Sequence, residues 1–173
     1  DYTQEGKPIF VAGSHNTRRK EFDKNKNRCL YWKPYEWYPQ IKNMIKCLYA
    51  ISHKPIIVFG EIYGSGVQDL TYGMENGVKD FRVFDISDGG TYLPWKTVNG
   101  YCYKFDIPTV PQLYKGPFSK NLIEEYTNGD SVLSHNDKFQ GREGIVITPL
   151  EERKDWQIGR VILKSISVDY LNR

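Results

Sequence analysis

Two short apolar segments most constrain what this chain of 173 residues can fold into. Residues 55–59 (PIIVF) run without a polar break into residues 60–64 (GEIYG), and residues 81–86 (FRVFDI) form a second run that is closed by Asp88-Gly89-Gly90. Runs of β-branched and aromatic residues of this length, bounded by glycine, are typical of strands. The centre of the chain therefore predicts a sheet.

A helix is predicted just before the first of these strands. From Gln40 onward, apolar residues recur at the helical spacing i, i+3, i+4, i+7, i+8, which predicts an amphipathic helix with one core-facing stripe. That stripe consists of Ile41, Met44, Ile45, Leu48 and Tyr49. Upstream, Pro34 and Pro39 bracket an aromatic-rich stretch from Trp32 and exclude a regular helix there.

The remaining elements are predicted from shorter patterns. Residues 9–12 (IFVA) read as the second strand of a hairpin whose first strand would lie before Asp1, and residues 144–148 and 159–166 each read as one strand. Ser119 is a typical N-cap for a short helix that ends near Asn128-Gly129. For residues 95–105 a strand and a helix both remain open. Together these elements predict one α+β domain over residues 1–173.

Composition narrows the class of protein. Hydrophobic residues make up 39% and charged residues 26%, which is typical of a globular chain, and the mean hydropathy is −0.59. No apolar run approaches the roughly 18 residues of a membrane helix, so we expect an intracellular, cytoplasmic protein that spans no membrane. Three cysteines that form no CxxC pair predict free thiols rather than disulfides or a zinc site.

Three predicted strands carry an ionisable residue where the apolar pattern favours none. Glu61 follows IIVFG, Glu143 precedes GIVITP, and Lys164 interrupts VILKSI. An ionised group in an apolar strand costs several kcal/mol unless it has a partner or a ligand. For each residue alone, a place at a strand end that faces water is the simpler explanation. Asp85, at the end of FRVFDI, either orients a neighbour or faces solvent.

These segments together resemble a known family. FGEIYGSGVQDLTYG, FRVFDI, REGIVITP and VILKSIS resemble motifs III, IIIa, IV and V of the covalent nucleotidyltransferases, most closely the ATP-dependent RNA ligases of the RNA ligase 2 type. Residues 106–119 (DIPTVPQLYKGPFS) resemble the segment that connects these motifs, and the resemblance extends from about Ile9 to Arg173. It implies an antiparallel-sheet nucleotidyltransferase core, ATP-grasp-like, with short packing helices.

The resemblance also implies a reaction and site residues. Enzymes of this family seal an RNA 5′-phosphate to a 3′-hydroxyl through lysyl-AMP and RNA-adenylate intermediates, using ATP and Mg²⁺ or Mn²⁺, in RNA repair. By resemblance, Lys164 would contact phosphate, Glu143 would hold the metal, Glu61 would bind the ribose hydroxyls and Phe84 would stack on adenine. Asn16 would bind the nucleotide from the candidate motif Ia, residues 13–16 (GSHN).

Two departures from the family pattern bear on activity. No lysine of this chain is followed by x-Asp-Gly or x-Asn-Gly, the motif I that carries the nucleophile, so we expect that lysine a little upstream of Asp1. The domain would then lack its motif I strand, and the chain alone would be inactive. Motif V also departs, because the second lysine of its common K-x-K is Ile166. The motif Ia candidate has His15 where arginine is common.

Alternatives follow from these departures. The chain could be a nucleotide- or RNA-binding module without chemistry, or it could act in capping guanylylation or DNA end sealing within the same superfamily. The expected partners are RNA ends or a nicked duplex, together with an N-terminal segment or further domain of the same protein. The basic stretch from Arg18 to Arg28 is either a solvated face or a surface that follows phosphates, which the aromatic run after it could supplement by stacking.

Overall fold

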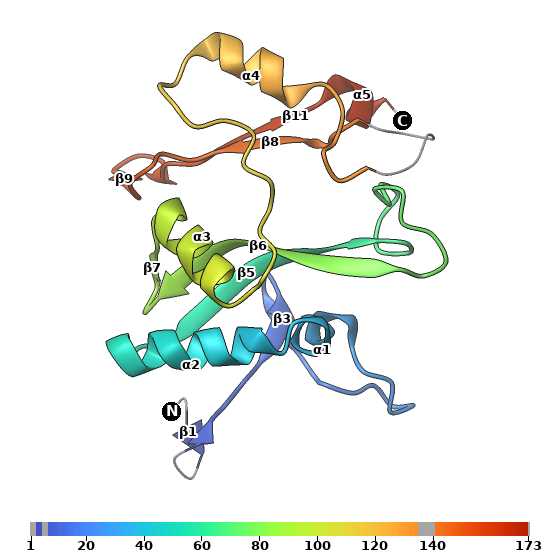
Figure 1. Cartoon of the computed structure of the whole chain (residues 1–173), viewed down its shortest axis with the longest axis vertical. Coiled ribbons are helices and arrows are strands. Elements are labelled where there is room, and N and C mark those ends of the chain that lie inside the picture. Colours follow the sequence, from blue (N-terminus) through green and yellow to red (C-terminus); the bar gives the residue numbers. More distant parts are fainter. Residues whose placement is uncertain (1–2, 5–6, 135–140, 173) are drawn as a thin grey trace. The chain divides into compact units, whose positions relative to one another are not determined.

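The computed structural model describes residues 3–4, 7–134 and 141–172 (Figure 1). The chain divides into two compact units: residues 1–62 with 80–109, and residues 63–79 with 110–173. All described strand pairs whose register is known are antiparallel. The mixture of helices and antiparallel strands confirms the predicted α+β class.

The first unit contains two small hairpins, a three-stranded sheet and the longest helices. The sheet has the order β5-β6-β7. The elements of this unit, two of which run past its boundary, are β1 (Thr3–Gln4), β2 (Lys7–Pro8), β3 (Ala12–Ser14), β4 (Thr17–Arg19), the 3₁₀ helix η1 (Leu30–Trp32), α1 (Pro34–Trp37), α2 (Gln40–Ser52), β5 (Ile56–Gly64), β6 (Lys79–Asp88), β7 (Thr91–Tyr92) and α3 (Trp95–Lys104).

The core of the first unit forms where α2, α3 and the sheet meet (Figure 1). Helix α2 contributes the predicted stripe, in which Ile41, Met44 and Leu48 are buried. The fully buried members from β6 and α3 include Val83 and Val98. Burial of each such side chain contributes roughly 1.5–3 kcal/mol, so this cluster is the main source of the unit's stability.

One glycine allows the sheet and its core to pack this closely. A Cβ atom at Gly60, in β5, would lie deep inside van der Waals contact with the ring of Phe81 and 2.7 Å from the carbonyl oxygen of Arg82. Both neighbours belong to β6. Glycine at position 60 is therefore required by close approach of the two strands and the buried ring.

Helix α3 resolves the choice that the sequence left open. Val98 and Cys102, four residues apart, are both buried, whereas Tyr103 is 89% exposed. The alternation of Tyr101, Tyr103 and Phe105 suggested a strand, but the residues that pack inward follow helical spacing.

Burial also raises the pKa of the Cys102 thiol to about 11. All three cysteines are free, as predicted.

The prediction that prolines exclude a helix after Trp32 is wrong. Helix α1 begins at Pro34, and the 3₁₀ helix η1 precedes it. A proline at the first helical position loses no hydrogen bond, because its missing N–H would have no partner inside the helix anyway. Pro39 lies just before α2 as its N-cap residue and is equally harmless.

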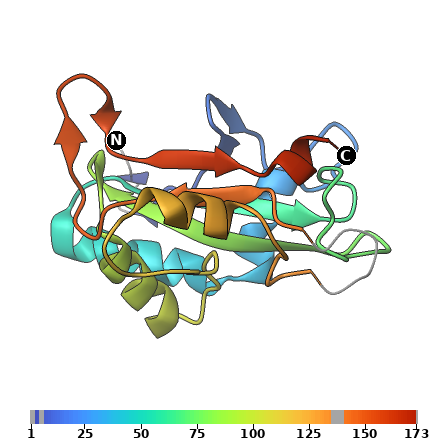
Figure 2. The same ribbon diagram turned by 90° about the horizontal axis from the view of Figure 1, so that it is seen from above.

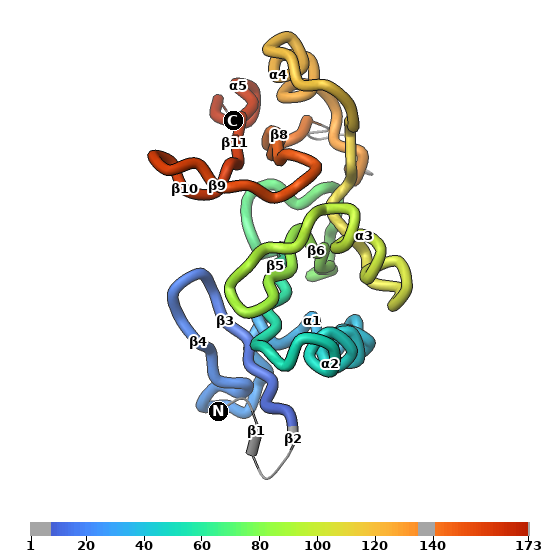
Figure 3. The backbone as a smooth tube through the Cα atoms, turned by 90° about the vertical axis from the view of Figure 1, so that its left-hand side faces the viewer, coloured from blue at the N-terminus to red at the C-terminus, as the bar shows by residue number. Residues whose placement is uncertain are grey.

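The prediction of a strand over residues 9–12 is also wrong for most of that run. Only Ala12 is in a strand, and β3 pairs with the downstream strand β4 through Ser14 and Thr17 (Figure 3). Ile9 and Val11 are 41% and 46% exposed, so the apolar run does not form a buried strand. The unmatched strand that suggested a partner before Asp1 is therefore absent from the described structure.

The second unit is built on one antiparallel pair of strands. Helix α4 packs against both β8 and β11 (Figure 2), and Ser119 is its N-cap residue as predicted. This unit also contains the loop between β5 and β6. Its own elements are α4 (Lys120–Thr127), β8 (Gly144–Ile147), β9 (Lys154–Asp155), β10 (Gly159–Arg160), β11 (Leu163–Ile166) and α5 (Val168–Leu171).

The single strand predicted over residues 159–166 is instead two strands. Arg160 pairs with Lys154 in the β9–β10 hairpin, whereas Leu163 pairs with Ile147 of β8. Because the two halves have different partners, the chain must leave one sheet before it enters the other. The break falls at residues 161–162, which no strand includes.

Candidate active site

An exposed aromatic surface lies on the sheet of the first unit. Phe84 of β6 is 40% exposed and stacks on Phe59 of β5, with ring centroids 6.5 Å apart and an interplanar angle of 29°. Phe59 in turn contacts Tyr92 of β7 at 5.5 Å. One ring from each strand therefore forms a continuous aromatic surface, which we call the aromatic ledge: Phe59, Phe84 and Tyr92.

Glu61 lies beside this ledge. It is two residues beyond Phe59 on β5, so it belongs to the same face of the strand, and it is exposed. The charge is therefore in the middle of a strand rather than at its end. A flat apolar ring with a carboxylate nearby suits a nucleoside, since a base stacks on the ring and ribose hydroxyls donate to the carboxylate.

Neither Asn16 nor Asp85 is part of the aromatic ledge. Asn16 lies in the exposed turn of the β3–β4 hairpin. Asp85 on β6 is 9% exposed, which excludes the alternative in which it faces solvent. A buried carboxylate at this position indicates a structural or orienting role inside the sheet rather than direct solvent contact.

Glu143 and Lys164 form an ion pair in the second unit. Lys164 lies within β11, and its Nζ donates to Oε1 of Glu143 at 2.9 Å. Glu143 comes directly before β8, and its carbonyl oxygen accepts a hydrogen bond from the N–H of Ser167 after β11. The strand pairing therefore unites two predicted site residues that are 21 positions apart.

Gly144 allows the two strands to approach at this point. Its φ is 153°, and a Cβ atom there would overlap the backbone carbonyl of Ser165 in β11. The residue after Glu143 must consequently be glycine if β8 is to pair with β11 in this register. The backbone of the strands thus determines the position from which Glu143 extends.

The exposure of this ion pair limits its contribution to stability. The side chain of Lys164 is 56% exposed and that of Glu143 is 25% exposed. Exposed pairs of this kind stabilise a fold by about 0.2–1 kcal/mol at most. An accessible ammonium group beside an accessible carboxylate is instead suited to neutralise a phosphate and to contribute to metal binding.

A network that sequence reasoning missed holds the base of this site. Arg142, the neighbour of Glu143, donates from Nη1 to the carbonyl oxygen of Tyr126 and from Nη2 to that of Asp130. Its backbone N–H donates to Gly129. Thr127 of α4 also bonds the hydroxyl of Ser165 in β11 at 2.7 Å. Arg142 therefore ties the C-terminal end of α4 to the start of β8. A cation is favourable at the C-terminal end of a helix because the helix dipole is negative there.

The side chains of this site suit a metal ion that is bound mainly by water and substrate phosphates. Within residues 3–4, 7–134 and 141–172, no group of three or more His, Cys, Asp or Glu side chains gathers. Mg²⁺ commonly keeps several waters and binds through one or two carboxylates together with substrate phosphates. A single accessible carboxylate, Glu143, fits that mode but not an all-protein metal cage.

Comparisons with known proteins indicate a family and a fold. A family model described as RNA ligase matches residues 5–166. Two solved structures of Naegleria gruberi RNA ligase mutants with ATP and Mn are similar to the chain at 20% identity, with TM-scores of 0.64 and 0.65. A third, of the same ligase with PPi, is similar at 19% identity and a TM-score of 0.64.

The extent of these matches is uneven. The match to each of these three solved structures covers 94% of this chain but 47% of the ligase chain. The chain therefore spans about half the length of the ligase. No curated protein sequence matches the chain. Among the residues that the structure describes, no helix is long and apolar enough to cross a lipid bilayer.

Proposed function

The chain belongs to the RNA ligase family, and on that premise we propose that it forms most of the adenylyltransferase domain of an ATP-dependent RNA ligase. The observation that carries the proposal is the accessible Glu143–Lys164 pair, formed by the two strands that resemble motifs IV and V. The similar Naegleria ligase has been solved with ATP and Mn and with PPi, the substrate and leaving group of adenylylation.

In the proposed function, the first unit binds the nucleoside of ATP. Adenine stacks on Phe84 of the aromatic ledge, a contact worth roughly 1–3 kcal/mol. Glu61 accepts hydrogen bonds from the ribose hydroxyls, and Asn16 contributes to nucleotide binding from its turn. Phe59 supports the Phe84 ring from the neighbouring strand.

The second unit provides charge for the phosphates. The ammonium group of Lys164 neutralises negative charge that develops on the α-phosphate, which is the largest single contribution in many phosphoryl transfers. Glu143 holds Mg²⁺ or Mn²⁺ directly or through water. When bound, the metal would supply a Lewis acid that offsets negative charge on the phosphates.

Three displacements at phosphorus complete the proposed reaction. A lysine nitrogen attacks the α-phosphate and pyrophosphate leaves; an RNA 5′-phosphate oxygen then attacks the same phosphorus and the lysine leaves. Finally, a 3′-hydroxyl attacks the 5′-phosphate and AMP leaves. We place the nucleophilic lysine outside these 173 residues because no lysine here has the K-x-D/N-G pattern. A further N-terminal segment or domain of the same protein is therefore part of the proposal.

Without the nucleophilic lysine the chain should be inactive in ligation that starts from ATP. The third step needs no lysyl adduct, so it tests the proposal on this chain. We expect the chain with Mg²⁺ to join a 5′-adenylylated RNA to a 3′-hydroxyl end. Lys164→Ala should slow this sealing on the order of 100-fold or more, because an oxyanion loses its cation. Lys154→Ala removes an exposed lysine of the same unit and serves as the matched control, with sealing unchanged.

Two further measurements separate the alternatives. The intact mass after incubation with ATP and Mg²⁺ should show no added AMP, and a gain would identify a nucleophile among these lysines. A chain that binds ATP and RNA but seals no adenylylated end would be a binding module. Tighter binding of GTP than ATP would favour capping chemistry, and failure to bind either nucleotide would refute the proposed function.

A further inference from the structure

The segment from Thr17 to Glu36 concentrates the positive charge of the chain. It contains seven lysine and arginine residues and three acidic residues, a net charge of +4, whereas the whole chain carries +3. The remaining residues together are thus slightly acidic. This basic segment lies in the first unit and includes β4, η1 and the start of α1.

The acidic residues of the segment are all occupied by local partners. Glu21 pairs with Arg28 at 2.6 Å, and Glu36 pairs with Lys33 at 2.7 Å. The hydrogen bond from Lys33 lowers the pKa of Glu36. Asp23 accepts backbone N–H groups from its own turn at 2.8 Å, chiefly that of Asn27, which lowers its pKa. None of these carboxylates is therefore directed at the cations of β4.

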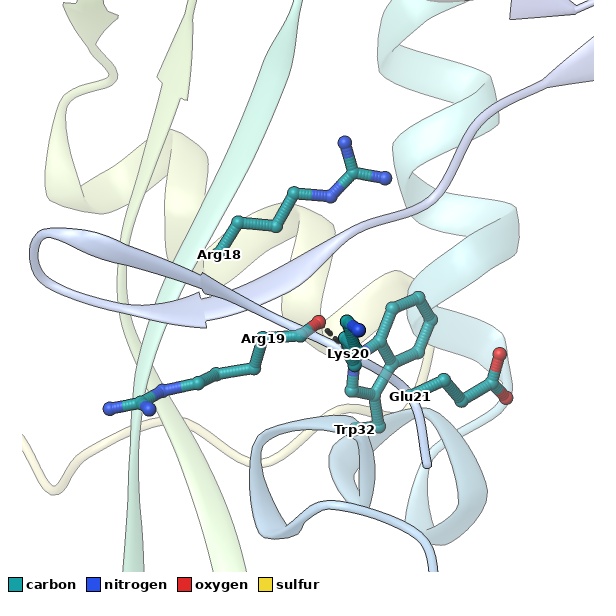
Figure 4. A pocket seen from close by; sticks show the side chains of 5 residues that line it. All are labelled: Arg18, Arg19, Lys20, Glu21 and Trp32. Carbon is teal, nitrogen blue, oxygen red and sulfur yellow. Dashed lines mark hydrogen bonds between the residues drawn. The ribbon is translucent and has the colours of Figure 1, made fainter. Parts of the chain in front are cut away.

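Three cations lie together at the end of β4 and directly after it. Arg18, Arg19 and Lys20 are exposed, and none has an ion pair in the part of the chain that the structure describes. They line an open hollow of about 570 Å³ together with Glu21 and Trp32 (Figure 4). We call this surface the basic hollow.

The walls of the basic hollow are held in place. The indole N–H of Trp32 donates to the carbonyl oxygen of Arg19 at 2.9 Å, which ties the end of β4 to η1 (Figure 4). The guanidinium of Arg19 lies 5.4 Å from the ring centroid of Tyr31, a cation–π contact that orients it. Because Trp32 is 9% exposed, it supports the hollow and is not available to stack on a base.

We infer that the basic hollow binds the phosphate backbone of the RNA substrate. Clustered cations without protein counter-ions, held by a fixed backbone, suit sequence-independent phosphate binding. Figure 4 shows the Arg18 and Arg19 side chains extending in different directions from the strand, as needed to reach phosphates of successive nucleotides rather than one anion. This inference rests on the proposed function, because it takes RNA as the substrate.

The test measures binding of a fluorescent single-stranded RNA of roughly 20 nucleotides, longer than the usual site of about 4–16. The variant Arg18→Gln/Arg19→Gln/Lys20→Gln should bind it about 10- to 100-fold more weakly. Each lost phosphate contact lowers the slope of log K against log salt by about 0.7, so the triple variant should lower it by about 2. The variant's thermal unfolding verifies that it folds.

Matched variants separate a local effect from net charge. Lys96→Gln/Lys104→Gln/Lys115→Gln removes the same charge from exposed positions elsewhere and should change affinity less than about threefold. Arg18→Lys/Arg19→Lys keeps the charge and should retain most of the affinity. Equal losses in the two glutamine variants would overturn the inference, because general charge would then explain binding.

Other outcomes distinguish this inference from the proposed function. If the wild-type chain binds RNA and the triple variant of the basic hollow binds it equally well, only the role of the hollow is refuted. If that variant loses ATP affinity but keeps RNA affinity, the hollow binds the nucleotide triphosphate instead, which also overturns the inference. A wild-type chain that binds no RNA would count against the proposed function itself.

Discussion

Replacing Gly60 by alanine should destabilise the protein by about 2–3 kcal/mol. The new Cβ atom would overlap the ring of Phe81 and lie 2.7 Å from the carbonyl oxygen of Arg82. Phe81 is 7% exposed and belongs to the core, so its ring cannot turn into solvent, and the carbonyl moves only if β6 moves. Overpacking of a filled core costs about 1–3 kcal/mol, and a backbone clash places this site at the upper end.

Gly100→Ala supplies the matched control. Gly100 lies inside α3, is exposed, and has nothing within 4 Å of the position of a Cβ atom. The same chemical change should therefore stabilise the protein by about 0.5–1 kcal/mol, because alanine favours the helix. One substitution thus has opposite signs at two positions, and only the packing around each glycine differs.

Thermal unfolding measures both effects. For a chain of this size about 1 kcal/mol corresponds to 2–4 °C, so Gly60→Ala should lower Tm by about 4–12 °C and Gly100→Ala should raise it by about 1–4 °C. In a double-mutant cycle, Phe81→Leu should cost less in the Gly60→Ala background than alone, because it removes part of the clash. A Tm for Gly60→Ala within about 1 °C of wild type would refute the reasoning.

Three further predictions concern the aromatic ledge, a half-buried phenol and a half-buried ion pair. Phe84→Ala should weaken ATP binding about 10-fold, whereas Phe84→Trp should weaken it less, because the indole ring can still stack on adenine. Calorimetric titration measures both affinities. Equal losses of affinity would indicate that Phe84 has a packing role instead. Burial raises the pKa of Tyr35 to about 12, so the folded state favours the neutral phenol. The free energy of unfolding should therefore fall as the pH rises from 10 to 12. Urea unfolding of Tyr35→Phe over the same pH range should lose this dependence on pH. Arg160 donates to Glu152 at 3.0 and 2.7 Å, and the two side chains are 16% and 17% exposed. Glu152→Ala removes both contacts and should cost about 1.5–3 kcal/mol in urea unfolding, and replacing both residues should cost less than the sum of the single losses. Additive losses would contradict this coupling.

Elements whose signal is local were predictable from the sequence. The helix from Gln40 to Ser52 and the strands around residues 56–64 and 79–88 follow from side-chain periodicity and flanking glycine within each segment. The resemblance of four segments also led to the family, which the family-model match over residues 5–166 confirms. The roles of Lys164, Glu143, Glu61, Phe84 and Asn16 stay predictions.

Two features could not be predicted correctly from residue type alone: the effect of Pro34 on a helix and the burial of the apolar run at Ile9. The sequence pattern predicts that Pro34 breaks a helix, yet Pro34 begins α1, because the cost of a proline depends on where the helix starts. The apolar run at Ile9 predicts a strand, although Ile9 itself is 41% exposed and lies outside any described strand. Whether an apolar run is buried depends on what covers it, and the run itself contains no such information.

The sequence by itself determined which residue types lie at which spacing: a helical stripe, apolar strands, charged residues within them and a basic stretch that begins in β4. Only the tertiary structure decided which of them meet. Antiparallel pairing of β8 with β11 brings Lys164 to Glu143 across 21 positions, and neighbouring strands bring Phe59 to Phe84. The physical reason is that periodicity arises within a segment, whereas strand partners are selected by long-range burial and hydrogen bonding.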